Sequence, residues 1–204
     1  MKAATTAAID FYFDFSSPYG YLAAQAIDDI GARHGIDVAW RPFLIGAVFK
    51  ITGAQPLPHT PMKGKYAGID MPRAARLLGV PFVAPETFPF QSVAACRAYY
   101  WLAEDDPARS RDFARAVFDG AFGEGRDMSS AETVIEEAVK LGIDREALGA
   151  ALEDPAVKDR LRNEVDAAIA RGVFGSPFFF LDDEPFWGHD RLDQVDRWLE
   201  TGGW

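Results

Sequence analysis

The sequence predicts an α/β fold in which a βαβ unit and a ββα unit lie on either side of an all-helical insertion. Three observations predict it: a strand–helix–strand pattern at the start of the chain, a long helical stretch after it, and two short strands near the end. We place residues 1–45 and 172–204 in the α/β domain and residues 46–171 in a loop-plus-helical insertion. A chain of 204 residues is long enough for one domain with such an insertion.

The βαβ unit begins with residues 9–15, a run dense in aromatic side chains that is typical of a buried strand. A Ser-Ser-Pro sequence ends this run, and proline fits the first turn of a helix because its missing N–H would have no partner there. Apolar residues then recur at helical spacing over residues 21–30, and residues 36–43 return to a strand pattern. Two strands joined in this way form a parallel pair with a right-handed crossover.

The insertion opens with residues 46–66, where many glycines and prolines predict a loop that holds one short helix. From about residue 70 to residue 171 the pattern is helical. Residues 129–132 match a capping box, and Asp154 with Pro155 forms an N-cap and first-turn pair. Two helices are therefore expected to begin at these points.

The ββα unit begins where the period changes. Residues 176–181 form an apolar strand that a proline opens, and residues 182–185 form a turn. A second short strand follows at residues 186–187, and Asp190 begins the last helix.

The composition excludes several functions. There are 31 acidic and 21 basic residues, and the net charge of −10 opposes binding to nucleic acid. One cysteine excludes an intrachain disulfide, a CxxC redox pair and a multi-cysteine zinc site, and three scattered histidines predict no metal site. No stretch of about 18 apolar residues predicts a membrane span, and the first residues lack the apolar core of a signal peptide. We therefore expect a cytoplasmic protein.

The Ser-Ser-Pro turn is the sharpest chemical feature. A polar pair at the entry to a helix faces the positive end of the helix dipole, which favours an anion or a thiolate. An ordinary N-cap explains the same serines. No histidine or aspartate at a defined spacing, and no G-x-S-x-G sequence, marks a serine nucleophile. The residues alone leave the N-cap and the anion site both open.

Five blocks of the sequence resemble the 2-hydroxychromene-2-carboxylate isomerase family, which is related to kappa-class glutathione transferases. In order along the chain the blocks are FYFDFSSPYGYLA, RPFLIG, MKGKY, FGSPF and FWGHDR. They span nearly the whole chain. The resemblance implies a thioredoxin-like (DsbA-type) fold, whose thioredoxin-like part would be residues 1–45 and 172–204.

The resemblance also implies a glutathione-dependent isomerase of aromatic catabolism. Such an enzyme interconverts 2-hydroxychromene-2-carboxylate and trans-o-hydroxybenzylidenepyruvate: the thiolate adds, the ring opens, a bond rotates and the thiol leaves. The partners implied are a small aromatic carboxylate substrate and a second copy in a homodimer. A kappa-type glutathione transferase or peroxidase is the alternative for the same site, and a non-catalytic thioredoxin-fold binding module is a remote one.

Carried over by position, Ser17 is the active-site serine and would stabilise the glutathione thiolate. Gly20 stands where an oxidoreductase of this fold has its second cysteine, which excludes disulfide exchange there. Ser176 and Pro177 would form a cis-proline site whose backbone pairs with the cysteinyl unit of glutathione.

Three further residues would bind the ends of glutathione. Lys63 would pair with the glycyl carboxylate, and His189 and Asp190 would meet the γ-glutamyl end.

The substrate side is less well defined by the resemblance. Arg41 and Phe43, in one of the matched blocks, are assigned to substrate binding, and Arg41 and Lys50 are candidates for binding a substrate carboxylate. Ala54 stands where relatives commonly have an asparagine, and neighbouring Gln55 is the candidate that would take its place.

Overall fold

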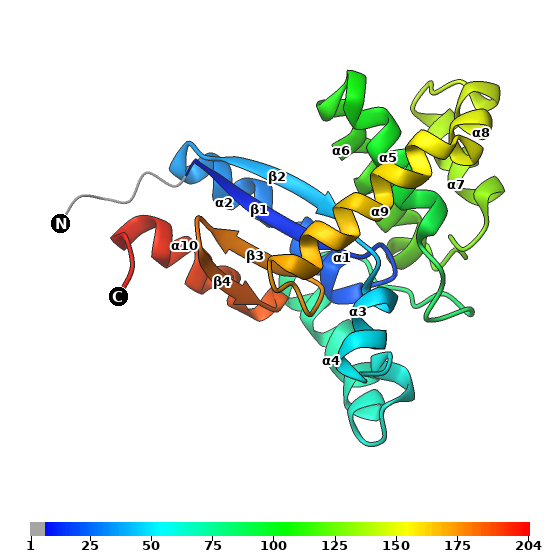
Figure 1. Cartoon of the computed structure of the whole chain (residues 1–204). Helices are drawn as coiled ribbons and strands as arrows, with labels where there is room; N and C mark the ends of the chain where they lie inside the picture. Colours follow the sequence, from blue (N-terminus) through cyan, green and yellow to red (C-terminus); the bar gives the residue numbers. More distant parts are fainter. Residues whose placement is uncertain (1–6) are drawn as a thin grey trace.

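Four strands form one mixed sheet in the computed structural model, which describes residues 7–204 (Figure 1). In the order β2-β1-β3-β4, they are β2 (Asp37–Pro42), β1 (Ala8–Phe13), β3 (Phe178–Leu181) and β4 (Glu184–Trp187). β1 runs parallel to β2 and antiparallel to β3, and β4 runs antiparallel to β3. The predicted α/β fold with βαβ and ββα halves is confirmed. The two central strands come from opposite ends of the chain.

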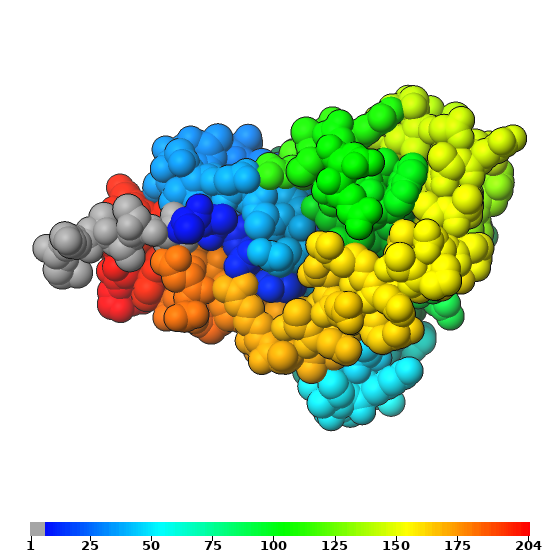
Figure 2. Space-filling model, turned by 45° about the horizontal axis from the view of Figure 1, so that its top comes forward, coloured from blue at the N-terminus to red at the C-terminus, as the bar shows by residue number. Residues whose placement is uncertain are grey.

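Helices pack around this sheet and extend beyond one end of it (Figure 1). The helices of the two α/β units are α1 (Pro18–Ala24), α2 (Ile27–His34) and α10 (Leu192–Thr201). Between β2 and β3 the chain forms α3 (Ile45–Thr52), α4 (Lys63–Leu78), α5 (Val93–Asp105), α6 (Pro107–Phe118), α7 (Ala131–Lys140), α8 (Arg145–Glu153) and α9 (Pro155–Ala170). α5 to α8 gather beyond the end of the sheet, whereas the segment around α3 and the start of α4 protrudes from the body on its own (Figures 1 and 2).

Helix starts and stops follow the sequence where the capping residue is local. Ser130 caps α7 by accepting a hydrogen bond from the Thr133 N–H at 3.0 Å, and Asp154 caps α9. The last helix does not begin at Asp190 as expected: Asp190 lies inside a short 3-10 turn, His189–Arg191, and α10 begins after it, at Leu192.

Two other expectations about helices were wrong. The helix expected at residues 21–30 is two helices, because α1 ends at the Gln25 cap and Ala26 leaves helical geometry before α2 begins. In residues 46–66, α3 is the one short helix that was expected in the loop, but α4 begins at Lys63, earlier than the helical pattern from about residue 70 predicts. The start of α3 is hidden in the sequence because Leu44, at its N-cap position, has no side-chain oxygen to cap it. Residues 1–6, which we did not expect to be a targeting segment, lie outside the described residues.

The core is built on β1, as its aromatic pattern predicts. Ile9, Phe11 and Phe13 are fully buried, and Phe11 and Phe13 both pack against Trp40 of β2 with ring centroids 5.1 and 5.4 Å away. Burying such a side chain contributes about 1.5–3 kcal/mol. Cys96 is buried in α5, as expected. Within residues 7–204, no helix is both long enough and apolar enough to cross a membrane.

Candidate active site

A cavity of about 1900 Å³ opens beside the carboxyl end of β1. Its walls come from the turn after β1, from α3 and α4, from residues 88–93, and from the segments just before β3 and just after β4. Nine of the residues predicted from the sequence line it: Ser17, Lys50, Ala54, Gln55, Lys63, Ser176, Pro177, His189 and Asp190. Pockets for a single small ligand have volumes of roughly 300–1000 Å³, so this cavity has room for two small molecules side by side.

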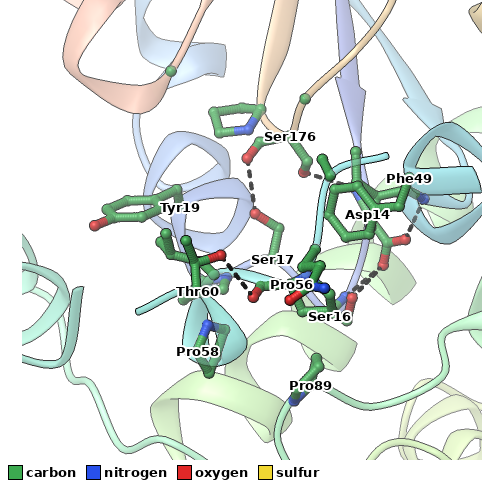
Figure 3. Close-up of a pocket in the computed structure, with 18 of the residues that line it drawn as sticks. Asp14, Ser16, Ser17, Tyr19, Phe49, Pro56, Pro58, Thr60, Pro89 and Ser176 are labelled. Atoms are coloured by element: carbon green, nitrogen blue, oxygen red, sulfur yellow. Dashed lines mark hydrogen bonds between the residues drawn. The ribbon is translucent and has the colours of Figure 1, made fainter. Parts of the chain in front are cut away.

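Ser17 lines this cavity and faces Ser176 (Figure 3). It is the N-cap of α1, and its Oγ accepts a hydrogen bond from the Gly20 N–H at 3.0 Å. The same hydroxyl donates to the Ser176 carbonyl oxygen at 2.9 Å. A Cβ at position 20 would lie 3.2 Å from both the Ser17 Cβ and the Ser176 Oγ, so glycine keeps this corner open. The N-cap and the cavity-facing hydroxyl are therefore the same group.

Ser176 and Pro177 face Ser17 from the start of β3. The peptide bond between them is cis, which confirms the prediction. The Ser176 Oγ accepts a hydrogen bond from the Asp14 N–H at 2.9 Å, and the Pro177 carbonyl accepts one from the Gly188 N–H at 3.1 Å. These bonds connect the Ser-Ser-Pro turn at residues 16–18 (the serine turn) to β3 and to the segment after β4, around the cavity.

Asp14 is a residue of this site that the sequence reasoning missed. Its side chain is almost fully buried beneath the serine turn, and burial raises the pKa of its carboxyl, against hydrogen bonds from Ser16, Ile45 and Ser92 that lower it. The signal in the sequence is a single acidic residue at the end of an otherwise aromatic strand.

A polar cluster around Tyr19 and Asp70 forms another part of the wall, and it too was missed. The Tyr19 ring stacks on His189, with centroids 4.8 Å apart, and its hydroxyl donates to Asp70 Oδ2 at 2.9 Å. Asp70 also accepts hydrogen bonds from Tyr66 and from Arg73. Burial lowers the pKa of His189, although Asp190 and Asp70 oppose this change, so its imidazole is mainly neutral at neutral pH.

Among the described residues of the cavity wall, two lysines are cations without an ion pair. Asp190 is paired with Arg191 at 3.0 Å, and Arg73 is held in the cluster just described. Within the described chain, Lys50 at the end of α3 and Lys63 at the start of α4 line the cavity and form no ion pair. The cavity therefore offers two positive charges to ligands, in a protein whose net charge is −10.

Arg41 and Phe43 do not line the cavity, which corrects their assignment to substrate binding. Arg41 lies within β2 opposite Tyr12, and its Nε donates to Asp10 Oδ1 at 2.6 Å. Phe43 is 1% exposed and packs against the Tyr12 ring. β2 continues to Pro42, so Arg41 lies within the sheet. Phe43 follows the strand into the core, and neither side chain reaches the cavity.

Comparison with known proteins agrees with this architecture. The family model of the DSBA-like thioredoxin domain matches residues 8–200. Over 192 residues, and 92% of either protein, the chain is 35% identical to a 2-hydroxychromene-2-carboxylate isomerase from Pseudomonas putida. The chain belongs to the 2-hydroxychromene-2-carboxylate isomerase family.

This family membership confirms the resemblance found in the five sequence blocks. A solved structure of a 2-hydroxychromene-2-carboxylate isomerase superposes with a TM-score of 0.86, at 31% identity and over 94% of each chain. The isomerase family also lies near the kappa class: glutathione S-transferase kappa 2 of Caenorhabditis elegans is 27% identical, over 94% of this chain and 91% of its own.

Proposed function

We propose that this protein is a glutathione-dependent isomerase that interconverts 2-hydroxychromene-2-carboxylate and trans-o-hydroxybenzylidenepyruvate. The observation that carries the proposal is the Ser17 hydroxyl, which is fixed by the Gly20 N–H and directed into a cavity with two unpaired lysines. The names of the isomerase relatives support the reaction, and the name of the kappa-class relative supports glutathione.

The residues present fit glutathione, a peptide with a thiol, two carboxylates and an ammonium group. Ser17 would hold the sulfur, Lys63 the glycyl carboxylate and Asp190 the ammonium, while Ser176 offers backbone groups to the cysteinyl unit. All four residues lie on the walls of one cavity. When bound, glutathione would supply a thiolate that adds reversibly to the conjugated substrate.

Ser17 can stabilise such a thiolate without any movement of the backbone. Its O–H now points to the Ser176 carbonyl, and rotation about the Cβ–Oγ bond can turn the proton to a sulfur in the cavity. The Gly20 N–H can remain on the oxygen throughout. A free thiol has a pKa of about 8.5, and lowering it by about two units takes roughly 2.7 kcal/mol, which one or two charge-assisted hydrogen bonds supply.

The remaining wall suits an aromatic carboxylate. Phe49, Phe88 and Phe90 line the cavity beside α3, and Lys50 adds an unpaired charge there. Aromatic side chains give a flat ring a large apolar contact, and an ammonium group attracts a carboxylate more strongly when water is excluded. We therefore assign the substrate carboxylate to Lys50 in place of Arg41.

The test is an assay of both directions of the interconversion, with and without glutathione, and with S-methylglutathione in its place. We expect turnover only with glutathione and inhibition by the S-methyl compound, because its sulfur cannot ionise. Turnover without any thiol would contradict the proposal.

A kappa-type transferase is the second candidate, supported by the kappa-class relative. Conjugation of glutathione to an uncharged aromatic electrophile, at a rate above that of isomerisation, would favour it. We also propose that the protein is a cytoplasmic homodimer that acts on a small aromatic carboxylate. Light scattering after size-exclusion chromatography tests the dimer.

A further inference from the structure

Asp14 is a buried acid without a cationic partner. Asp14 is 2% exposed, and its carboxylate forms no ion pair among the described residues. The other buried acid of the described chain, Glu137, is paired with Arg126 and with Lys140. Buried charges normally have such partners because desolvation is costly. An unpaired carboxylate in this position is unusual and calls for an explanation.

Hydrogen bonds from three separate segments take the place of an ion pair. Asp14 Oδ1 accepts from the Ser16 N–H and the Ser16 hydroxyl, both at 2.8 Å, and from the Ser92 hydroxyl at 2.7 Å. Asp14 Oδ2 accepts from the Ile45 N–H at 2.8 Å. Ser16 belongs to the serine turn, Ile45 begins α3 and Ser92 precedes α5. One carboxylate therefore joins the turn to the starts of two helices.

Both helices lack a cap of their own. The first N–H groups of a helix have no partner within it, and Leu44 has no side chain that can accept a hydrogen bond from them. Asp14 accepts the first of these N–H groups of α3 from another part of the chain. Ser92 is at the N-cap of α5, yet its hydroxyl makes no cap bond and donates to Asp14 instead. The Asp14 side chain thus replaces local capping at α3.

The main chain of Asp14 holds the two central serines as well. Its carbonyl accepts a hydrogen bond from the Ser17 N–H at 2.9 Å, and its N–H donates to the Ser176 Oγ at 2.9 Å. The Asp14 carboxylate binds the first N–H of α3, and α3 carries Phe49 and Lys50 of the proposed substrate wall. We call the side of the cavity around Ser17 and Ser176 the sulfur side, and the side around Phe49 and Lys50 the substrate side. Asp14 thus contacts segments on both sides (Figure 3).

We infer that Asp14 is a positioning residue whose carboxylate holds α3, and with it the substrate wall, in register with Ser17. This inference rests on the proposed function for what the two walls bind. The hydrogen bond from Ile45 to Asp14 is the link that carries it.

Asp14→Asn tests this link. The amide oxygen can keep the three donors on the Oδ1 side, but its NH₂ then faces the Ile45 N–H, donor against donor. Asp144→Asn is the matched control, because Asp144 is an exposed N-cap of α8 and asparagine caps a helix equally well.

Three measurements on the full-length protein follow: amide exchange of residues 45–52, KM for 2-hydroxychromene-2-carboxylate, and the thiolate absorbance of bound glutathione. In Asp14→Asn we expect faster exchange in α3 and a rise in KM of about fivefold or more, with the thiolate signal within about twofold of wild type. Unchanged exchange and KM would overturn the inference, as would equal losses on both sides of the cavity. A wild type that binds no glutathione would refute the proposed function, and exchange in α3 would still decide the role of Asp14.

Ile45→Pro is the second variant and keeps the inference open to refutation if Asp14→Asn does not fold. Proline is favoured at the first position of a helix and lacks the N–H that bonds Asp14, so the link disappears while the carboxylate stays. We expect KM for the substrate to rise as in Asp14→Asn. Ile45→Val trims one methyl group, keeps the N–H and should raise KM by less. Equal effects of the proline and valine variants would overturn the inference.

Discussion

The sulfur side and the substrate side of the cavity are built in different ways. On the sulfur side, Ser17 caps α1 just after β1, Gly20 lies in the first turn of α1, and Ser176 lies just before β3. Ser17 bonds both of the other residues directly, and β1 and β3 are neighbours in the sheet. On the substrate side, α3 and residues 88–93 come from the chain between β2 and β3, and the segment around α3 and the start of α4 protrudes from the body (Figure 2). The sheet therefore fixes the sulfur side, whereas the substrate side depends on longer-range ties such as that of Asp14. Substitutions should separate glutathione activation from substrate choice.

Ser17→Ala should have the largest effect of any single substitution. Removing a hydrogen bond donor to a reacting anion costs about 100-fold in rate, so we expect kcat/KM to fall by about that factor. Ser130→Ala is the matched control because Ser130 is also a serine N-cap, on α7 and away from the cavity. Both variants should lose about 1 kcal/mol of stability. Kinetics and thermal melts of the two variants distinguish a thiolate-stabilising hydroxyl from an ordinary N-cap. Similar activity in both variants would contradict the role proposed for Ser17.

Lys50→Gln should affect the substrate side alone. Removing the unpaired charge should raise KM for 2-hydroxychromene-2-carboxylate by about fivefold, about 1 kcal/mol, and leave the Kd of glutathione within about twofold. An uncharged electrophile, if it is accepted, should bind equally well to both proteins. A rise in the Kd of glutathione with no change in KM would reverse the assignment.

Lys63→Gln should show the opposite pattern, with a rise of about threefold in the Kd of glutathione. Lys65 is the control, since it lies two residues further along α4 and does not line the cavity. Isothermal titration of glutathione into Lys63→Gln and Lys65→Gln measures the difference. Equal affinities would show that Lys63 is an ordinary solvated lysine.

The smallest effect concerns Asp14 and pH. Burial raises the pKa of the folded Asp14 above the ordinary value of 3.8, so the folded state holds this proton more tightly than the unfolded state does. The ionised carboxylate therefore costs stability, and this cost grows as the pH rises from the ordinary pKa through the folded one. The Tm of Asp14→Asn minus that of wild type should increase by about 2 °C between about pH 4 and pH 7. A difference that stays constant or falls would contradict this sign.

The sequence predicted the sulfur side well because its determinants are local. A serine before a first-turn proline predicts the N-cap at Ser17. The cis peptide bond between Ser176 and Pro177 was predicted from the family resemblance of the FGSPF block. The substrate side was predicted less well. A strand pattern does not show where β2 ends relative to the cavity, so Arg41 and Phe43 were misplaced. Asp14 was missed because its partners Ile45 and Ser92 lie 31 and 78 residues away in the chain.

The start of α3 was missed for the same reason. Its cap is supplied by Asp14, and no capping pattern exists near Leu44 to mark it. The cluster of Tyr19 with Asp70 likewise joins residues 51 positions apart. Periodicity and capping rules describe a segment together with its neighbours in the chain. They do not describe a polar contact that two distant segments make only after folding.

The central claim is that Ser17 activates the sulfur of glutathione. It is tested most directly by titrating glutathione into wild type, Ser17→Ala and Ser130→Ala near neutral pH and recording the ultraviolet absorbance of the thiolate. We expect a saturable thiolate signal in wild type and in Ser130→Ala, and a much weaker one in Ser17→Ala. A signal of equal size in Ser17→Ala, or none in wild type at millimolar glutathione, would contradict this claim.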